Sequence, residues 1–518
     1  MSGGVLLIDF DRDGWQDIYF TNAPTVEMEL KGEKSKSLLY RNDGDGTFTD
    51  VTDEAGVGFP GFAMGGAVGD YNNDGFPDMY ITCLGENVLY RNNGDGTFTD
   101  VTKSAGAGDI RWTAGAAFGD LDGDGFLDLV VANYVDFDLN DLPGFGSLPT
   151  CKFRGIDVQC GPRGLKGAGD RVFKNNGDGT FTDVTTKAGM VDPDGFYGMQ
   201  PIISDYGGKG KQDVYVANDS TPNFFYQFKG NWVFEEIGLL SGTGVSGDGS
   251  EQGSMGVAIG DYLHTGKPAL YVTNFADEHN TLYKNNGEYD FTDVSFSAKV
   301  ALVSRPYVGW GTGFFDLDND TWLDLFVVNG HVYPQIDQIE SGSLKFKQRK
   351  LLFVNKGDGT FCDASDQAGG ALAIPRVSRG AAFGDIDNDG QIDVIVEDLD
   401  DSPPMILKNS GNKKNRWITL ELGAKHGNPL AIGARVKITA GGVVQTEEIR
   451  SGSSYLSQND LRVHFGLGEA TKVDEIEIRW NSGKTEQIRD VEPNKFYAIL
   501  EGEGLVSFGK IRPKLKRK

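Results

Sequence analysis

A nine-residue pattern, Asp-x-Asp-x-Asp-Gly-x-x-Asp, returns along most of this chain and constrains its fold more than any other feature. The copies begin about 50 to 85 residues apart, and most are flanked on both sides by short apolar segments. A repeat of this period indicates units that bury a core only when they pack against their neighbours. The seven copies, called loops one to seven below, span residues 9–17, 70–78, 120–128, 205–213, 261–269, 316–324 and 385–393.

The residues around each loop predict four short strands per unit. Small residues precede the loop, as at 115–119, and a β-branched run such as 127–132 follows it. A third strand then leads into Asn-x-Gly-Asp-Gly-Thr-Phe, whose Asn-Gly and Asp-Gly pairs favour hairpin turns because they tolerate positive φ. Gly is abundant, at 73 of 518 residues, which suits an all-β chain with many tight turns. We predict a seven-bladed β-propeller over residues 1–411, with an insertion at about 136–170.

The first unit starts directly at the strand that carries its loop. No Thr-Phe-Thr-Asp-Val-Thr segment precedes it, whereas such a segment stands ahead of the second unit at 47–52. We therefore expect the chain to begin within a longer repeat and the seventh blade to lack one strand. An early strand of the C-terminal region is an alternative source of that missing strand.

The five intact loops carry the ligand types that calcium prefers. Ca²⁺ takes six to eight oxygen ligands, and Asp at positions one, three, five and nine can wrap one ion while Gly at position six permits the sharp turn. These loops end at the ninth residue and lie between strands, so they are not EF-hands. Solvated Asp- and Gly-rich turns without an ion are the alternative, which five copies in one spacing disfavour. We predict about five Ca²⁺ ions, bound by Asp9, Asp11, Asp13, Asp17, Asp70, Asn72, Asp74, Asp78, Asp120, Asp122, Asp124, Asp128, Asp316, Asp318, Asp320, Asp324, Asp385, Asp387, Asp389 and Asp393.

Loops four and five have lost most of these ligands. Loop four has Gly207 and Lys209 at positions three and five, and we expect Lys209 or Lys211 to act as a tethered cation beside its two remaining acids. Loop five keeps only Asp261, and we expect it to bind no metal. Both loops are predicted to be structural turns.

The charge balance limits the classes of partner. The chain has 75 acidic and 49 basic residues, a net charge of −26, which repels nucleic-acid backbones and anionic membranes. No apolar run approaches the roughly 20 residues that span a bilayer. We therefore predict neither nucleic-acid binding nor membrane insertion. The basic tail at 505–518 is expected to be solvated.

The region after the last loop has a different pattern. Alternating apolar residues from 412 to 504, with Gly-Gly and Asn-Ser-Gly turns, predict a small antiparallel β-sandwich. Within the insertion, Cys151 and Cys160 are expected to form a disulfide, which implies an oxidising compartment; two reduced cysteines are the alternative. Cys83 and Cys362 are expected to be small buried residues.

At the loops the chain resembles the FG-GAP/VCBS repeat family, and other segments resemble the cartilage acidic protein family with its C-terminal ASPIC/UnbV domain. The resemblance covers nearly the whole chain and implies a calcium-binding propeller that is usually secreted or at the cell surface. It implies no particular ligand. Thr321 in place of Gly and the two depleted loops depart from the pattern. The matching segments beyond the loops are residues 160–165, 254–256, 308–313, 329–334, 431–438, 452–458, 463–468 and 478–483.

These features favour an extracytoplasmic binding or adhesion module for a glycan or protein, located outside the cell, on its surface or in the periplasm, although no signal peptide is seen. One alternative is a lyase, isomerase or hydrolase acting on a glycan or secondary metabolite, with His331 and carboxylates such as Asp219 and Glu251 as an acid–base site. His331 filling a joint between blades is the structural alternative. A third hypothesis is a structural subunit that self-assembles.

Overall fold

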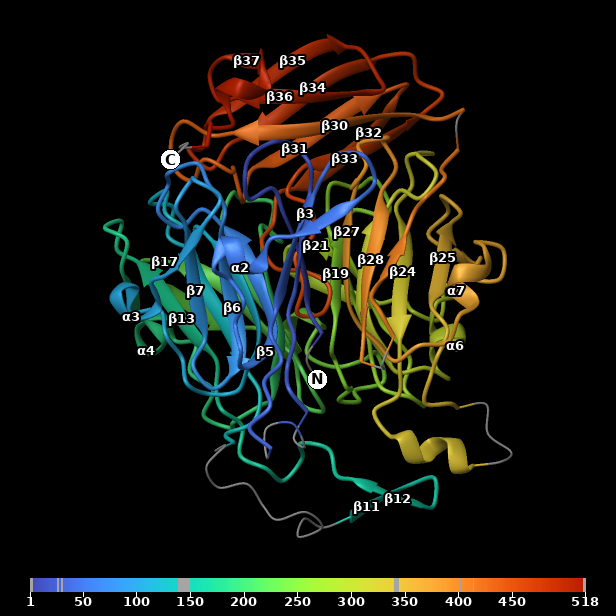
Figure 1. The fold of residues 1–518 in the computed structure, drawn as a ribbon. Coiled ribbons are helices and arrows are strands. Elements are labelled where there is room, and N and C mark those ends of the chain that lie inside the picture. Colours follow the sequence, from blue (N-terminus) through green and yellow to red (C-terminus); the bar gives the residue numbers. More distant parts are fainter. Residues whose placement is uncertain are drawn as a thin grey trace.

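The computed structural model describes residues 3–25, 28, 31–137, 150–339, 344–399, 402–412 and 414–515. Seven antiparallel sheets follow one another around an axis, and two further sheets cover one end of them (Figure 1). The seven-bladed propeller and the C-terminal β domain expected from the sequence are therefore present. No helix of the described part has the length and apolar character needed to span a membrane.

The first four blades run from the innermost to the outermost strand in chain order. The first blade has β1 (Val5–Ile8), β2 (Asp17–Phe20), β3 (Leu38–Asn42) and β4 (Phe48–Asp50); the second has β5 (Phe62–Gly69), β6 (Asp78–Leu84), β7 (Val88–Asn92) and β8 (Phe98–Asp100). The third has β9 (Thr113–Gly119), β10 (Asp128–Asn133), β13 (Arg171–Asn175) and β14 (Phe181–Asp183); the fourth has β15 (Gly198–Ser204), β16 (Asp213–Asn218), β17 (Phe224–Gly230) and β18 (Val233–Glu236).

The remaining blades repeat this order, except that the seventh has three strands among the described residues. The fifth has β19 (Val257–Gly260), β20 (Ala269–Val272), β21 (Thr281–Gly287) and β22 (Asp290–Asp293). The sixth has β23 (Gly309–Phe315), β24 (Asp324–Asn329), β25 (Leu351–Asn355) and β26 (Phe361–Asp363); the seventh has β27 (Ser378–Gly384), β28 (Asp393–Asp398) and β29 (Met405–Leu407). One-turn helices lie at α2 (Thr52–Ala55), α3 (Thr102–Ala105), α4 (Thr185–Ala188), α5 (Gly238–Ser241), α6 (Ala301–Ser304) and α7 (Gly370–Ala373), with a 3₁₀ turn η1 (Pro334–Gln338).

The strand order corrects one expectation from the sequence. The Thr-Phe-Thr-Asp-Val-Thr segment forms the outermost strand of the blade that precedes it in the chain, as β4 does in the first blade. The first sheet therefore lacks no strand, and the three-stranded seventh sheet is short of an outermost strand rather than an inner one. The first strand of the C-terminal domain pairs within that domain and does not complete the seventh blade.

Neighbouring blades are joined by buried apolar side chains. Each pair of consecutive blades shares a hydrophobic cluster, and the first and seventh blades are joined in the same way by Val5 and Leu7 against Ala382 and Ile395. The backbone N–H of Gly380 also donates to the carbonyl of Gly3 at 2.8 Å. Burial of these apolar side chains between the blades is the main favourable contribution to the free energy of folding of the propeller.

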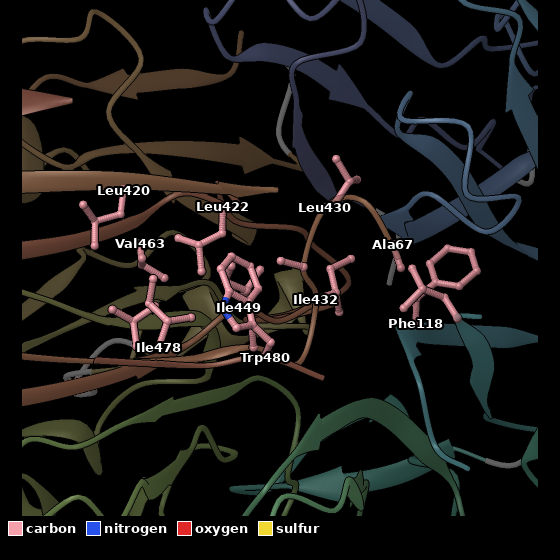
Figure 2. Close-up of a cluster of buried hydrophobic side chains, with 14 of the residues drawn as sticks. Ala67, Phe118, Leu420, Leu422, Leu430, Ile432, Ile449, Val463, Ile478 and Trp480 are labelled. Atoms are coloured by element: carbon pink, nitrogen blue, oxygen red, sulfur yellow. The ribbon is translucent and has the colours of Figure 1, made fainter. Parts of the chain in front are cut away.

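The C-terminal domain packs two sheets face to face over the propeller. Its core contains Ile478 and Trp480, and Figure 2 shows Leu430 and Ile432 between this core and the propeller residues Ala67 and Phe118. One apolar cluster thus spans both domains. The sheets contain β30 (Arg416–Gly423), β33 (Val463–Gly468), β36 (Lys495–Leu500) and β37 (Gly504–Val506), and β31 (Arg435–Ala440), β32 (Val443–Glu448), β34 (Val473–Arg479) and β35 (Thr485–Val491), with a 3₁₀ turn η2 (Phe508–Lys510).

The described part of the basic tail is solvated only in part: Lys510 and Lys514 are exposed as expected, whereas Ile511 and Arg512 pack against the C-terminal domain. β37 belongs to a sheet, and Ile511 is buried. The Arg512 Nε donates to both carboxylate oxygens of Glu421, at 3.0 and 2.9 Å. Residues 505–515 are therefore part of the C-terminal domain; residues 516–518 lie outside the described part.

A segment of the C-terminal domain, residues 451–460, fills the axis of the propeller; we call it the axial segment. The Tyr455 ring is fully buried and lies 4.8 Å from the ring of Trp310 in β23. Hydrogen bonds join the axial segment to the innermost strand of every blade, through Val5 (to Ser457), Val68 (to Ser451 and Gln458), Phe118 (to Ser451), Gln200 (to Leu456), Val257 (to Ser454), Thr312 (to Ser454) and Phe383 (to Asn459).

Glycines in the innermost strands make room for this segment. A Cβ on Gly65 would lie 2.3 Å from the Leu456 carbonyl oxygen, and one on Gly4 would lie 2.1 Å from the same atom. A Cβ on Gly115 or Gly256 would instead meet the innermost strand of the next blade, so the small residues ahead of the loops allow close approach both to the axial segment and between blades.

Candidate metal sites

All seven loops lie at the end of the propeller that faces the C-terminal domain (Figure 1). Each contacts that domain, so this face is not open to solvent as a separate binding surface. The contacts, in loop order, are made by Arg462 and Arg512, Pro513, Gly427, Arg479, Arg435, His464, and again Arg462.

The first and ninth residues of each intact loop hold its backbone. In loop six, the Asp316 carboxylate accepts the N–H groups of Asp320 at 3.0 Å and Thr321 at 2.7 Å. The Asp324 carboxylate accepts those of Leu317 at 3.1 Å and Asn355 at 2.8 Å. The bonds to the sixth residue, to the second residue and to the asparagine of the third strand recur in the other intact loops. These bonds aim the carboxylates into the loop.

That asparagine has a role beyond the hairpin turn that the sequence predicts. The Asn42 side-chain amide donates to the carbonyl of Gln16 in its own loop at 3.2 Å and to that of Ile386 in the neighbouring loop at 2.8 Å. The asparagines therefore tie adjacent loops together. The recurrence of Asn near the end of the third strand in six of the seven units was the available signal; Phe228 stands there in the fourth unit. The equivalent residues are Asn92, Asn175, Asn285, Asn355 and Asn409.

The structure brings carboxylates together in four of the five intact loops. In each of these loops, three carboxylates offer oxygens that lie within 4.8 Å of one another. Loop two has Asn72 at its third position, which hydrogen-bonds Asp74, so it presents an amide oxygen where the others present a carboxylate. The triads are Asp9, Asp11 and Asp13; Asp120, Asp122 and Asp128; Asp316, Asp318 and Asp320; and Asp385, Asp387 and Asp393.

Some predicted ligands lie outside these triads. Two lysines of third strands reach into loops: Lys174 pairs with Asp122 and, at 2.8 Å, with Asp124, and Lys408 pairs with Asp387. These lysines satisfy part of the negative charge at positions three and five. The predicted ligands outside the triads are Asp17, Asp124, Asp324 and Asp389, together with the four of loop two, Asp70, Asn72, Asp74 and Asp78.

Burial raises the pKa of the carboxyl groups at the first and ninth positions, because a low-dielectric site disfavours the charged form. Ionising several of them in one loop is unfavourable unless a cation lies between them. The pKa rises to about 7 for Asp9, Asp70, Asp324, Asp385 and Asp393, to about 6 for Asp120, and well above the ordinary value for Asp17, Asp78, Asp128 and Asp316.

The donor set fits a hard divalent cation. The converging atoms are carboxylate and amide oxygens, which calcium prefers over the nitrogen and sulfur ligands of zinc. Thr321 occupies the sixth position of loop six with φ of 91°, in the left-handed region that Gly adopts in the other intact loops. The loop fold is therefore kept despite the side chain.

The expectation for loop four is wrong in one respect. Lys209 lies 3.4 Å from Glu288 and above the ring of Tyr289, and Lys211 lies above the ring of Phe228. Neither lysine side chain pairs with the Asp205 carboxylate, which accepts the backbone N–H of Lys209 at 2.8 Å and forms its ion pair with Arg479 of the C-terminal domain. Sequence alone could not have identified this partner, which is 274 residues away.

His331 lies on the opposite face of the propeller, among aromatic rings. Its ring centroid is 5.5 Å from those of Phe153 and Phe275 and 5.3 Å from that of Tyr333. Burial lowers the pKa of His331 to about 4, and its Nδ1 accepts the N–H of Tyr333 at 3.1 Å. Its Nε2 has no hydrogen-bond partner among the described residues.

The carboxylates proposed to work with His331 are engaged elsewhere. Asp219 accepts the hydroxyl of Tyr134 at 2.8 Å, and Glu251 pairs with Arg163 at 2.9 Å. The geometry therefore gives no support to an acid–base site at His331, and the ring fills a joint between segments.

Phe153 reaches His331 from the insertion in the third blade. There β11 (Thr150–Phe153) and β12 (Ile156–Gln159) form a hairpin on this face, and Cys151 and Cys160 are disulfide-bonded. Arg154 of the hairpin pairs with Asp277 of the fifth blade at 2.5 Å. Of the other cysteines, Cys83 is buried as expected, whereas Cys362 is exposed.

Comparison with known families agrees with this architecture. A family described as FG-GAP-like repeat matches residues 9–81, 70–131 and 347–396, and the ASPIC and UnbV family matches residues 424–506. Cartilage acidic protein 1 of Xenopus tropicalis is 27% identical over 310 residues, covering 58% of this chain and 43% of that protein. The Homo sapiens protein is 26% identical over 326 residues, covering 62% and 46%. The chain thus spans less than half the length of these relatives.

Solved structures with a similar arrangement include a lectin of Agrocybe aegerita that recognises non-reducing terminal N-acetylglucosamine. Its TM-score is 0.40, with 17% identity over 70% of this chain and 79% of the lectin. The exotype rhamnogalacturonan lyase YesX has a TM-score of 0.35, with 13% identity over 95% and 90%. On its sequence matches, the chain is a protein of FG-GAP-like repeats followed by an ASPIC and UnbV domain, and it is similar to cartilage acidic protein 1.

Proposed function

We propose that this protein is a calcium-binding propeller that acts outside the cytoplasm as a binding or adhesion module. The observation that carries the calcium assignment is the convergence of carboxylates, three to a loop within 4.8 Å, on loops with a shared backbone geometry. Like charges so close together in partly buried sites need a counter-ion. Five Ca²⁺ ions would reduce the net charge from −26 to −16.

An extracellular location agrees with the disulfide and with the affinity expected of the calcium sites. The Cys151–Cys160 disulfide is of a kind that persists in oxidising compartments. Calcium sites in extracellular modules have dissociation constants of roughly 10⁻⁴ to 10⁻³ M, which the extracellular calcium concentration reaches. The relatives named for cartilage are consistent with the same setting.

The ligand surface that we propose is the face opposite the loops. The C-terminal domain covers the loop face and the axial segment fills the axis, which leaves the opposite face as the surface that we propose for a macromolecular ligand. On the opposite face, Phe275 and Phe153 are partly exposed next to the charged pair Arg154–Asp277. Aromatic rings beside charged groups are typical of surfaces that bind glycans or proteins.

Calorimetric titration with CaCl₂ tests the calcium assignment. We expect about five sites in the wild type and one fewer in a variant with both Asp120→Asn and Asp122→Asn. Lys267→Ala, in loop five, is the matched control and should leave the count unchanged. Absence of binding, together with a melting temperature that EDTA does not change, would refute the assignment.

A glycan and extracellular-protein array, probed with and without EDTA, tests the binding role. We expect at least one ligand to bind the wild-type protein in calcium. Its binding should be lost when EDTA is added and also in the Phe275→Ala variant. A ligand whose binding neither change affects would contradict the proposed surface.

A further inference from the structure

Loops four and five keep the fold of the intact loops without their acidic residues. In both, the first aspartate accepts the N–H groups of the fifth and sixth residues, at 2.8 and 2.8 Å for Asp205 and at 2.9 and 2.6 Å for Asp261. These distances match those in the intact loops. The two loops are therefore built like cation sites and lack only the ligands at positions three, five and, in loop five, nine.

An arginine of the C-terminal domain enters each of these loops. The Arg479 guanidinium pairs with the Asp205 carboxylate, whose side chain is 1% exposed. The Arg435 guanidinium donates to the carbonyl of Gly266, at the sixth position of loop five. A positive charge thus reaches each loop although no cluster of carboxylates remains there.

The two arginines lie directly opposite each other on neighbouring antiparallel strands. The register pairs Arg435 of β31 with Arg479 of β34. Like charges in this position destabilise a sheet by themselves, so the pair needs negative partners outside it. The loops supply them through the Asp205 carboxylate and the Gly266 carbonyl dipole.

A glutamate of the same sheet completes the contact with loop four. Glu448 lies opposite Arg435 on β32 and is buried. Its carboxylate accepts the Ser204 hydroxyl at 2.9 Å, the Gln212 amide at 3.0 Å and the backbone N–H of Asp205 at 3.2 Å. Loop four is therefore held by two side chains of the C-terminal domain, the acidic Glu448 and the basic Arg479.

We propose that loops four and five are arginine sockets, in which Arg479 and Arg435 take the place of the cation that the other loops bind. The C-terminal domain is then attached to the fourth and fifth blades without calcium, and to the other five through loops whose shape depends on calcium. The second half of this statement rests on the proposed calcium binding; the first half does not.

Hydrogen exchange of the full-length protein, followed by mass spectrometry, tests the proposal loop by loop. We expect EDTA to speed exchange in loops one, two, three, six and seven and to leave 205–213 and 261–269 protected. In calcium, the double variant Arg479→Gln and Arg435→Gln should speed exchange in those two segments by about tenfold or more, because the buried Asp205 carboxylate and the Gly266 carbonyl lose their partners. Arg489→Gln, on the exposed side of the same sheet, is the matched control and should change neither segment.

Two results would overturn the proposal: equal opening of all seven loops in EDTA, or continued protection of loops four and five in the double variant. If EDTA opens no loop, the calcium assignment fails, and the double variant still decides whether arginine holds the two loops. If the double variant does not fold, Arg479→Lys provides the measurement. It keeps the charge but not the planar fork, so we expect 205–213 to show intermediate protection.

Discussion

The substitution Asp11→Asn is expected to have opposite effects on stability with and without calcium. Asp11 stands at the third position of loop one, where its Oδ1 accepts the N–H of Asp13 at 3.2 Å. Asn72 stands at the same position of loop two and accepts the N–H of Asp74, also at 3.2 Å. The change therefore removes a charge and keeps a hydrogen bond that this protein already makes with asparagine.

The magnitude follows from the pKa of Asp11. Burial, and then the Asp13 charge, raise that pKa from 3.8 to about 6. Each pKa unit corresponds to about 1.4 kcal/mol, so ionised Asp11 costs the metal-free fold about 3 kcal/mol, which its partial exposure reduces to about 1–2 kcal/mol. Because the folded pKa is raised, this cost is absent below about pH 4 and fully present above about pH 6.

Thermal unfolding at pH 8 is the assay. In EDTA, Asp11→Asn should raise the melting temperature by about 1–2 °C for a chain of this size. In saturating calcium it should lower it, because losing one charged ligand that weakens the site about a hundredfold removes about 2.7 kcal/mol of ligand stabilisation, more than the roughly 1–2 kcal/mol gained by the metal-free fold. The reciprocal variant Asn72→Asp should show both effects with reversed sign. A change of the same sign in both conditions would refute the reasoning.

Three further outcomes are expected. His331 should contribute a loss of up to about 3 kcal/mol of stability as the pH falls from 6.5 to 4, because its pKa is lowered to about 4 in the fold and the unfolded chain takes up the proton first; in denaturant titrations the stability of the wild type relative to His331→Phe should fall by this amount over the same range. Tyr455→Ala should cost about 3–5 kcal/mol, because its ring is fully buried against Trp310, whereas the exposed Leu505→Ala should change stability by less than about 0.5 kcal/mol. Reducing the Cys151–Cys160 disulfide should speed proteolysis within the insertion and leave the calcium-induced shift in melting temperature unchanged.

Each of these outcomes has a clear contradiction. A difference in stability between the wild type and His331→Phe that is the same at pH 6.5 and at pH 4 would show that His331 does not titrate in this range. Equal losses for Tyr455→Ala and Leu505→Ala would mean that the axial segment contributes little to stability. A smaller calcium-induced shift in melting temperature after reduction would show that the insertion is energetically coupled to the loops on the opposite face.

The repeat made the propeller predictable. Each loop, its flanking strands and its Asn-Gly turn are local features, and seven copies in one register leave few alternative folds. The triads within a loop were equally accessible, because Asp9, Asp11 and Asp13 are close in sequence and the turn brings them together. The error in strand assignment within the propeller arose where a segment could belong to either of two neighbouring blades.

Contacts between distant parts of the chain were not predictable in the same way. Nothing near Asp205 identifies Arg479 as its partner, and Ser451–Gln458 reads as a polar turn rather than as the filling of an axis. Both depend on where the C-terminal domain docks, which composition and periodicity do not encode. Part of the tail was misjudged for the same reason, since Arg512 finds Glu421 only in the folded domain.

The axial segment also bears on the order in which the protein folds. Ser457 contacts Val5 across 452 residues of sequence, and the innermost strand of each blade waits for a partner synthesised after all seven. During translation the nascent blades surround an incomplete centre, and closing it requires a late, long-range step of the kind that slows folding. A chain released before its last hundred residues would therefore expose the innermost strands of seven blades to one another and to chaperones, so synthesis of the C-terminal domain is what completes the centre of the propeller.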